Sequence, residues 1–139
     1  MWNELCSAPG AEGQFQGRLN PTQSACVLNL SRLSPGDLLP LLLMAHFLCD
    51  FGLQSDRMAR EKCPGGDSTL PWGWWLTAHA AIHGLAVALL TGVPGLGLAE
   101  MAVHAWIDHA KCAGRISLRV DQLLHMMCKG LWVLILAAG

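Results

Sequence analysis

Residues 71–99 read PWGWWLTAHAAIHGLAVALLTGVPGLGLA and contain no Asp, Glu, Lys or Arg. The part from 72 to 91 has the length that a helix needs to cross a hydrocarbon core of about 30 Å. Residues 118–138 form a second long apolar stretch, and two shorter stretches, 38–53 and 96–112, each contain His and Asp. Beside the stronger spans, we interpret the shorter stretches as spans that carry functional polar groups. The sequence therefore predicts four membrane-spanning helices, at about 36–54, 72–91, 95–112 and 118–138.

The composition of the chain also favours a membrane protein. Hydrophobic residues make up 53% and charged residues 14%, whereas a soluble domain carries about 25% charged residues. The mean hydropathy is +0.37. Nine Lys and Arg are balanced by ten Asp and Glu, so the chain has no net positive electrostatic field that would attract nucleic acid. The expected partner is a lipid bilayer, and a soluble helical bundle is the alternative fold.

The 139 residues favour a single folded domain. No segment shows the two-residue alternation of a strand, and turn signals separate the apolar stretches at 63–67, 91–95 and 113–117. The predicted fold is all-α, a polytopic membrane four-helix bundle over residues 34–139 with a polar His/Asp stripe inside. Residues 1–33 are predicted to be a poorly ordered N-terminal extension, with a short helical turn near 25–33.

Basic residues set the expected orientation of the bundle. Six of them lie in or beside the loops after the first and third helices: Arg57, Arg60, Lys62, Lys111, Arg115 and Arg119. The opposite side has only Arg18 and Arg32. Because Lys and Arg accumulate in cytoplasmic loops, we predict that loops 55–71 and 113–117 are cytoplasmic and that both termini lie outside.

The six cysteines show no CxxC spacing, and Cys49 and Cys128 fall inside predicted spans. A secreted disulfide framework is therefore not expected. Free and mostly buried thiols are the prediction.

Ionisable residues inside the predicted helices recur four positions apart. Residues at i and i+4 share a helix face, and charged groups in spans normally face the bundle interior. Each helix therefore carries one polar stripe, and the four stripes are expected to converge. They consist of His46 and Asp50 with Gln54 beyond, His79 and His83, Glu100, His104 and Asp108, and Asp121 and His125.

Depth along the helices arranges these residues in layers. Counted from the cytoplasmic ends, His46, His79, His104 and His125 lie about 10–12 Å deep, and Asp50, Asp108 and Asp121 about 5–6 Å deep. The register of the last two helices also predicts a buried ion pair between Glu100 and Lys129. His109 points away from the stripe and is expected at the membrane interface.

Imidazole and carboxylate groups in such an arrangement are typical of a zinc, manganese or iron site. A cation would also offset carboxylate charges in apolar surroundings. We predict a bound divalent metal ion, with zinc as the leading candidate. Its candidate ligands are His46, Asp50, His79, His83, His104, Asp108, Asp121 and His125. Asp50, Asp108 and Asp121 are also the candidate catalytic groups, as ligands, as groups that orient a histidine, or as a general base. The alternative is that these polar groups only hold the helices together.

Four motifs occur in order along the chain: HFLCDFGLQSD (46–56), HAAIHG (79–84), HAWID (104–108) and DQLLH (121–125). Together they resemble the family filed as domain of unknown function 3307, over about residues 38–137. The resemblance implies a small polytopic membrane protein of bacteria or their phages, and hence the bacterial inner membrane as its location. Cys49 stands where a small residue such as Ala is expected, and Lys129 lies outside the pattern. The resemblance implies no activity.

Three functions fit the pattern. The first is a metal-dependent hydrolase that acts on a lipid head group or lipid-linked ester, with a spare aspartate as general base. The second is a transporter or relay for metal ions or protons, which with four helices would need a homo-oligomer. The third is a non-catalytic membrane scaffold. The hydrolase is the leading interpretation, because aspartates beyond a four-ligand site favour it over a scaffold.

Overall fold

The computed structural model describes residues 33–138, which fold into helices without a strand. Their elements are α1 (Pro35–Phe47), a π-helical turn (Leu48–Gly52), α2 (Asp56–Glu61), α3 (Trp72–Thr91), α4 (Pro94–Cys112) and α5 (Leu118–Ala138). The predicted all-α class is confirmed, and the four long helices lie close to their predicted bounds. The predicted N-terminal extension and its helical turn lie outside the described residues, apart from Leu33.

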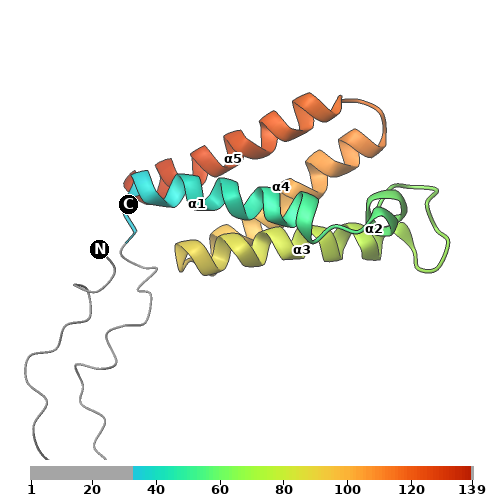
Figure 1. Ribbon diagram of the computed structural model, residues 1–139, viewed down its shortest axis with the longest axis horizontal. Helices are drawn as coiled ribbons and strands as arrows, with labels where there is room; N and C mark the ends of the chain where they lie inside the picture. Colours follow the sequence, from blue (N-terminus) through green and yellow to red (C-terminus); the bar gives the residue numbers. More distant parts are fainter. Residues whose placement is uncertain (1–32, 139) are drawn as a thin grey trace, which may run out of the picture.

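The four long helices form a ring in which each helix packs against two others. α3 contacts α1 and α4, and α5 contacts the same two helices. α2 and the turn between α4 and α5 lie at one end of the bundle, whereas the start of α1 and the C-terminus lie at the other (Figure 1). We call the first of these the loop end, defined by residues 55–71 and 113–117.

Local sequence signals explain where the long helices begin and end. The Ser34 side chain accepts a hydrogen bond from the backbone N–H of Asp37 at 3.2 Å, and Pro35 takes the first helical position. α3 ends at Gly92, whose φ of 69° is a left-handed conformation that glycine adopts without strain. Pro94 then begins α4. The break between α3 and α4 lies within the turn that the sequence predicts at 91–95.

Two elements differ from the predicted helix 36–54 and loop 55–71. The first helix changes to π-helical geometry at Leu48–Gly52, so that Asp50 lies within this wider turn. The following loop contains α2, because the Ser55 side chain accepts a hydrogen bond from the backbone N–H of Met58 at 3.2 Å and caps a short helix. Neither feature follows from hydropathy, which does not distinguish a π-helical turn from an α-helix and is low across the loop that contains α2.

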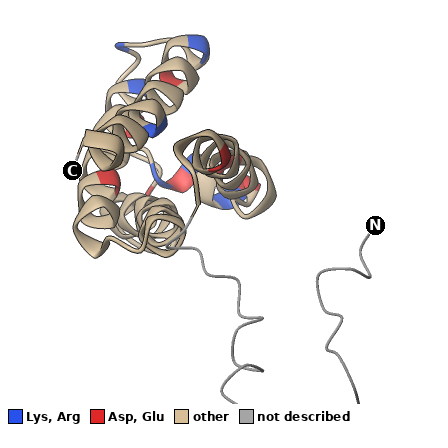
Figure 2. Cartoon of the chain, turned by 90° about the vertical axis from the view of Figure 1, so that its left-hand side faces the viewer, with Lys and Arg blue, Asp and Glu red and all other residues tan. Residues whose placement is uncertain are grey.

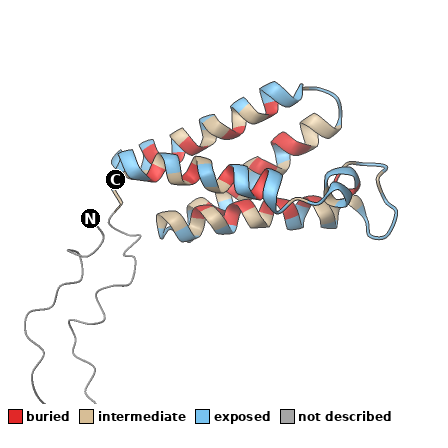
Figure 3. Cartoon of the chain, viewed as in Figure 1, coloured by how far each residue is buried: buried red, intermediate tan, exposed pale blue. Residues whose placement is uncertain are grey.

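The interior of the bundle is unusually polar. Its buried side chains include five histidines, several carboxylates and the two lysines Lys62 and Lys129. Buried positions lie on the helix sides that face one another (Figure 3), and acidic positions are found there too (Figure 2). Large apolar side chains are exposed on the outside, among them Trp106, Leu98 and Met44. The interior thus combines these polar groups with an apolar cluster of Leu38, Leu42, Val87, Trp132 and Val133, while large apolar side chains also cover the outside, unlike in a typical water-soluble domain.

Two of the described helices, α3 and α5, are long and apolar enough to cross a membrane. α1 is shorter, and α4 carries more polar residues. The lengths and compositions of α3 and α5 agree with two of the four predicted spans. The other two spans stay predictions.

The prediction of free thiols is wrong for one pair of cysteines. Cys63 of the 55–71 loop and Cys112 at the end of α4 form a disulfide. The two residues are 49 positions apart in sequence, and only the folding of the loop against the end of α4 brings them together. Cys49 and Cys128 are free, as predicted.

Candidate metal centre

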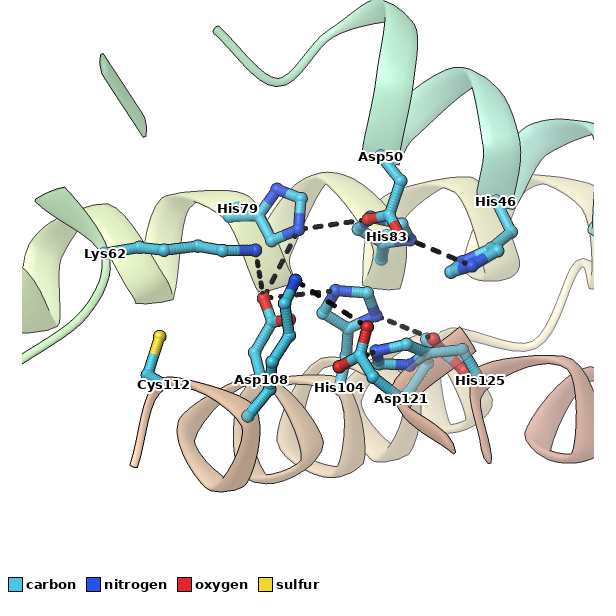
Figure 4. A network of polar contacts seen from close by, with 12 residues as sticks. His46, Asp50, Lys62, His79, His83, His104, Asp108, Cys112, Asp121 and His125 are labelled. Atoms are coloured by element: carbon cyan, nitrogen blue, oxygen red, sulfur yellow. Dashed lines mark hydrogen bonds and ion pairs between the residues drawn. The ribbon is translucent and has the colours of Figure 1, made fainter. Parts of the chain in front are cut away.

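The eight predicted metal-site residues converge in the middle of the bundle, where all of them are buried. They come from α1 with its π-helical turn, α3, α4 and α5, and their side chains point toward one another (Figure 4). We call this set the His/Asp cluster: His46, Asp50, His79, His83, His104, Asp108, Asp121 and His125. The i, i+4 stripes read from the sequence therefore do face a common interior.

Asp50 is the contact point between α3 and the first helix. Its Oδ1 lies 3.0 Å from His83 Nε2 and 3.2 Å from His79 Nε2. Its Oδ2 accepts a hydrogen bond of 2.7 Å from the Gln122 side-chain amide, and His46 Nε2 lies 3.5 Å from the same oxygen. The π-helical turn places Asp50 against side chains from two other helices, in keeping with the frequent use of such turns at functional sites.

Asp108 joins α3 to α4 in a similar way. Its Oδ2 lies 3.4 Å from His79 Nε2 and 3.7 Å from His104 Nε2. The same oxygen accepts a hydrogen bond from the ammonium of Lys62, at the C-terminal end of α2. His79 thus stands between two carboxylates, a position that suits a ligand or a proton carrier.

Three imidazole rings form a stack across the bundle. The ring centroids of His83 and His104 are 3.7 Å apart, and those of His104 and His125 are 4.1 Å apart. His46 lies beside this stack, 5.2 Å from both His83 and His125. Because His79 lies 5.0 Å from His104, the four histidines predicted to share one layer are neighbours, and His83 is part of the same group.

Three sets of side chains bring their ligand atoms within 4.8 Å of one another. The first set contains Asp50, His79, His83 and His104, the second Glu100, His104 and His125, and the third Asp108, Asp121 and His125. The first set has the four donors of a tetrahedral site. His46 belongs to none of these sets within residues 33–138 and lies at their edge.

Many polar atoms of the His/Asp cluster make no well-oriented hydrogen bond, although several of them lie within 3.0–3.7 Å of a carboxylate oxygen. Ten buried side-chain nitrogen and oxygen atoms in the described part of the chain are of this kind, and eight belong to the cluster. These eight are found in His46, His79, His83, His104, Asp121 and His125. An unsatisfied buried polar group costs about 1–3 kcal/mol. A divalent cation would engage several of these lone pairs at once, so the donor set fits a metal ion.

The predicted ion pair between Glu100 and Lys129 is confirmed. The Lys129 ammonium donates a hydrogen bond to Glu100 Oε1, and both side chains are buried. The Trp132 indole N–H donates to Glu100 Oε2 at 2.6 Å. These partners satisfy the Glu100 carboxylate, so Glu100 links α4 to α5 and is not needed as a metal ligand. His104 Nδ1 also lies 3.5 Å from Glu100 Oε1.

Three polar residues of the centre were absent from the prediction. Gln122 bridges Asp50 and His46, because its side-chain nitrogen donates to Asp50 Oδ2 and its side-chain oxygen accepts from His46 Nε2 at 3.3 Å. Lys62 binds Asp108, and Lys111 Nζ lies 3.7 Å from Asp121 Oδ2. Gln122 follows a predicted ligand in sequence, which is a weak signal. Nothing in the sequence indicated that Lys62, a loop residue, would turn inward.

Two other predicted positions lie outside the cluster. His109 stacks on Trp72 with ring centroids 5.6 Å apart, away from the other histidines. The Gln54 side-chain oxygen is buried without a hydrogen-bond partner. His109 therefore provides a natural control for experiments on the cluster.

These features define a class: a small helical-bundle protein with a polar interior, an apolar exterior and a buried group of histidines and aspartates. Residues 38–137 match the family described as Protein of unknown function (DUF3307), and the chain belongs to this family. Searches found no matching curated protein and no matching solved structure. The suggestion made by the four sequence motifs is thereby confirmed, and the function has to be argued from the site.

Proposed function

We propose that this protein is an integral membrane protein that binds a divalent metal ion within its helical bundle and hydrolyses a membrane-associated substrate there. Zinc is the leading candidate for this ion. The observation that carries the proposal is the group of eight buried nitrogen and oxygen atoms that make no well-oriented hydrogen bond, contributed by four helices to one interior space. Hydrogen bonds between helices alone would not leave so many groups unsatisfied.

The apolar exterior supports a location in the membrane. Trp106 and Leu98 of α4 are 72% and 70% exposed, and Leu134 of α5 is 67% exposed. Large contiguous apolar surfaces are unfavourable in water and favourable in hydrocarbon. In this proposal all four long helices span the bilayer, and the basic residues of the loop end hold it in the cytoplasm of a bacterial cell.

The charges of the centre support a divalent ion. Asp50, Asp108 and Asp121 are three carboxylates, and Lys62 is the one fully buried ammonium that contacts them. With neutral imidazoles, the cluster then carries two uncompensated negative charges, while Glu100 and Lys129 neutralise each other. One divalent cation removes this charge, which would otherwise be costly at this depth.

The residues of the centre divide naturally between metal binding and proton transfer. Asp50, His79, His83 and His104 offer a four-donor set. A bound divalent ion would supply Lewis acidity and lower the pKa of a coordinated water to about 7. Asp108 Oδ2 faces two of these histidines and is held by Lys62. We therefore assign Asp108 the role of general base, with Asp121 beside it.

The test uses the full chain in phosphatidylcholine nanodiscs, with zinc loaded or removed by a chelator. Hydrolysis is measured on carboxylic esters and phosphodiesters that partition into the disc. Asp108→Asn should lower the rate by about 100-fold or more while zinc is retained. Asp56→Asn, on the exposed side of α2, is the matched control and should leave the rate unchanged. A zinc-loaded protein inactive on both ester classes would contradict the hydrolase.

The row of imidazole–carboxylate contacts favours one second candidate, a proton relay. His79 lies between Asp50 and Asp108, and His104 lies between Asp108 and Glu100, so protons could pass along these groups through the bundle. Proteoliposomes distinguish the two functions. A relay predicts a proton flux that depends on His104 and needs no ester substrate, whereas a hydrolase predicts none.

A further inference from the structure

Two lysines contact carboxylates of the same ligand set from the loop end. Lys62, 3% exposed, binds Asp108 Oδ2, and the partly exposed Lys111 lies 3.7 Å from Asp121 Oδ2. Asp108 and Asp121 belong to one of the three candidate ligand sets. Figure 4 shows the Lys62 side chain reaching in toward Asp108 from the side opposite to His46.

The burial of Lys62 calls for an explanation. Lysine almost never lies fully inside a protein unless it is paired, and the desolvation of its ammonium costs several kcal/mol. The Asp108 carboxylate is this partner, and it holds the ammonium inside the cluster, since Asp108 Oδ2 also lies 3.4 Å from His79 Nε2 and 3.7 Å from His104 Nε2. A metal ion bound by Asp50, His79, His83 and His104 would therefore lie close to the Lys62 ammonium.

The Asp108 carboxylate offsets only one of the three positive charges that a divalent ion and the Lys62 ammonium would bring together, so an anion in contact with both cations would lower their mutual repulsion. The charges of the centre indicate the charge that such an anion should carry. A divalent ion neutralises the buried cluster, and Lys111 then leaves one positive charge in excess. A monoanion would balance it, and a phosphodiester group is a monoanion at neutral pH.

We propose that Lys62 and Lys111 form an anion-binding subsite beside the metal ion, which takes the phosphate group of the substrate. The proposal rests on the metal site of the proposed function and names the substrate class as a phosphate ester. Ammonium groups bind phosphate oxygens by charge-assisted hydrogen bonds. The exposed Arg115 at the same end of the bundle does not contact the cluster and serves as a comparison.

The experiment measures binding of inorganic phosphate to the full chain in phosphatidylcholine nanodiscs by calorimetry, with and without zinc. We expect phosphate to bind the zinc-loaded protein. Its affinity for the zinc-free protein should be lower by about tenfold or more. Lys62→Met should lower the phosphate affinity about tenfold while the zinc content stays unchanged. Arg115→Met should change neither quantity.

The outcomes separate the two proposals. A wild-type protein without zinc affinity overturns the proposed function. A protein that binds zinc, but whose phosphate affinity is the same with Lys62→Met as without it, overturns the subsite alone. Loss of zinc from a folded Lys62→Met protein shows a purely structural counter-ion and also overturns the subsite. If Lys62→Met does not fold, Lys111→Met is the second variant, with a smaller loss of phosphate affinity expected.

A further arm identifies the source of the phosphate group. Nanodiscs that contain phosphatidylglycerol present an anionic phosphodiester at the loop end of the bundle, whereas the phosphodiester of phosphatidylcholine is balanced by its own choline cation. If the subsite takes lipid head groups, phosphatidylglycerol should weaken the binding of inorganic phosphate to the zinc-loaded wild type and leave Lys62→Met unaffected. Unchanged binding of inorganic phosphate assigns the subsite to a soluble phosphate ester.

Discussion

The imidazole rings of His83 in α3 and His104 in α4 stack with centroids 3.7 Å apart and ring planes 23° apart. Such a distance requires the two helices to approach closely just beyond the rings. Gly84 and Gly97 provide this approach, because a Cβ atom added to either would lie 2.6 Å from the carbonyl oxygen of the other. The geometry of the centre therefore depends on residues without side chains.

Gly84→Ala should separate α3 from α4 and lower the stability of the bundle by about 1–3 kcal/mol. It should also weaken metal binding, because His83 moves with the helix. The measurement is thermal unfolding in detergent, together with zinc content. Gly130→Ala in α5 is the control, since nothing lies within 4 Å of its added Cβ. Equal stability of the two variants would show that the close approach is not needed.

The Glu100–Lys129 pair should behave as a buried ion pair. Lys129→Met alone leaves the Glu100 carboxylate buried with only Trp132 as a full hydrogen-bond donor, and should cost about 3–5 kcal/mol. The double variant with Glu100→Gln should be more stable than Lys129→Met, because no unpaired charge remains. Unfolding in detergent measures both. A double variant as unstable as the sum of its two single variants would mean that the residues do not interact.

The Cys63–Cys112 disulfide allows a test of membrane orientation. A cross-link that closes a loop of this length stabilises a protein by about 4 kcal/mol in the chain-entropy account, so Cys63→Ser should lower stability under oxidising conditions only. Disulfides are rare in the cytoplasm, and the proposed topology, which rests on the basic residues, has the loop end in the cytoplasm. We predict that alkylation in intact cells finds both cysteines as thiols, and that oxidation of isolated membranes joins them. A disulfide already present in cells would put the loop end outside and reverse the predicted topology.

Glu61 should make the 55–71 loop sensitive to acid. Hydrogen bonds from Ser68 at 2.5 Å, Arg57 at 2.7 Å and Thr69 at 2.9 Å lower the pKa of its carboxyl to about 2. A carboxyl with a lowered pKa stabilises the fold above its ordinary value of 4.5, and this contribution is lost as the pH falls toward 2. Hydrogen exchange in α2 should therefore accelerate over this range. In the Glu61→Gln variant, hydrogen exchange in α2 should be faster at neutral pH and should depend less on pH. A pH dependence of exchange unchanged by this substitution would contradict the role of Glu61 in holding the loop.

The fold and most of the site were predictable because both depend on periodicity. Spacing of four residues fixes a common helix face, so the convergence of His46, His79, His104 and His125 followed from the sequence alone. Lys62 was missed because its position depends on α2, a short helix capped by Ser55 within a polar loop. The disulfide was missed for the same reason, since it joins that loop to the end of α4. Long-range contacts of irregular segments leave no periodic signal.

The central claim, a zinc ion bound by histidines and aspartates inside the bundle, is tested most directly by X-ray absorption at the zinc edge on the full chain in nanodiscs. We predict roughly one zinc ion per chain with nitrogen and oxygen neighbours at about 2.0–2.2 Å and imidazole scattering. This signal should be lost in His104→Ala and kept in His109→Ala, whose ring stacks on Trp72 away from the cluster. A protein that retains no zinc or other divalent ion, or a zinc spectrum with sulfur neighbours at about 2.3 Å, would contradict the account.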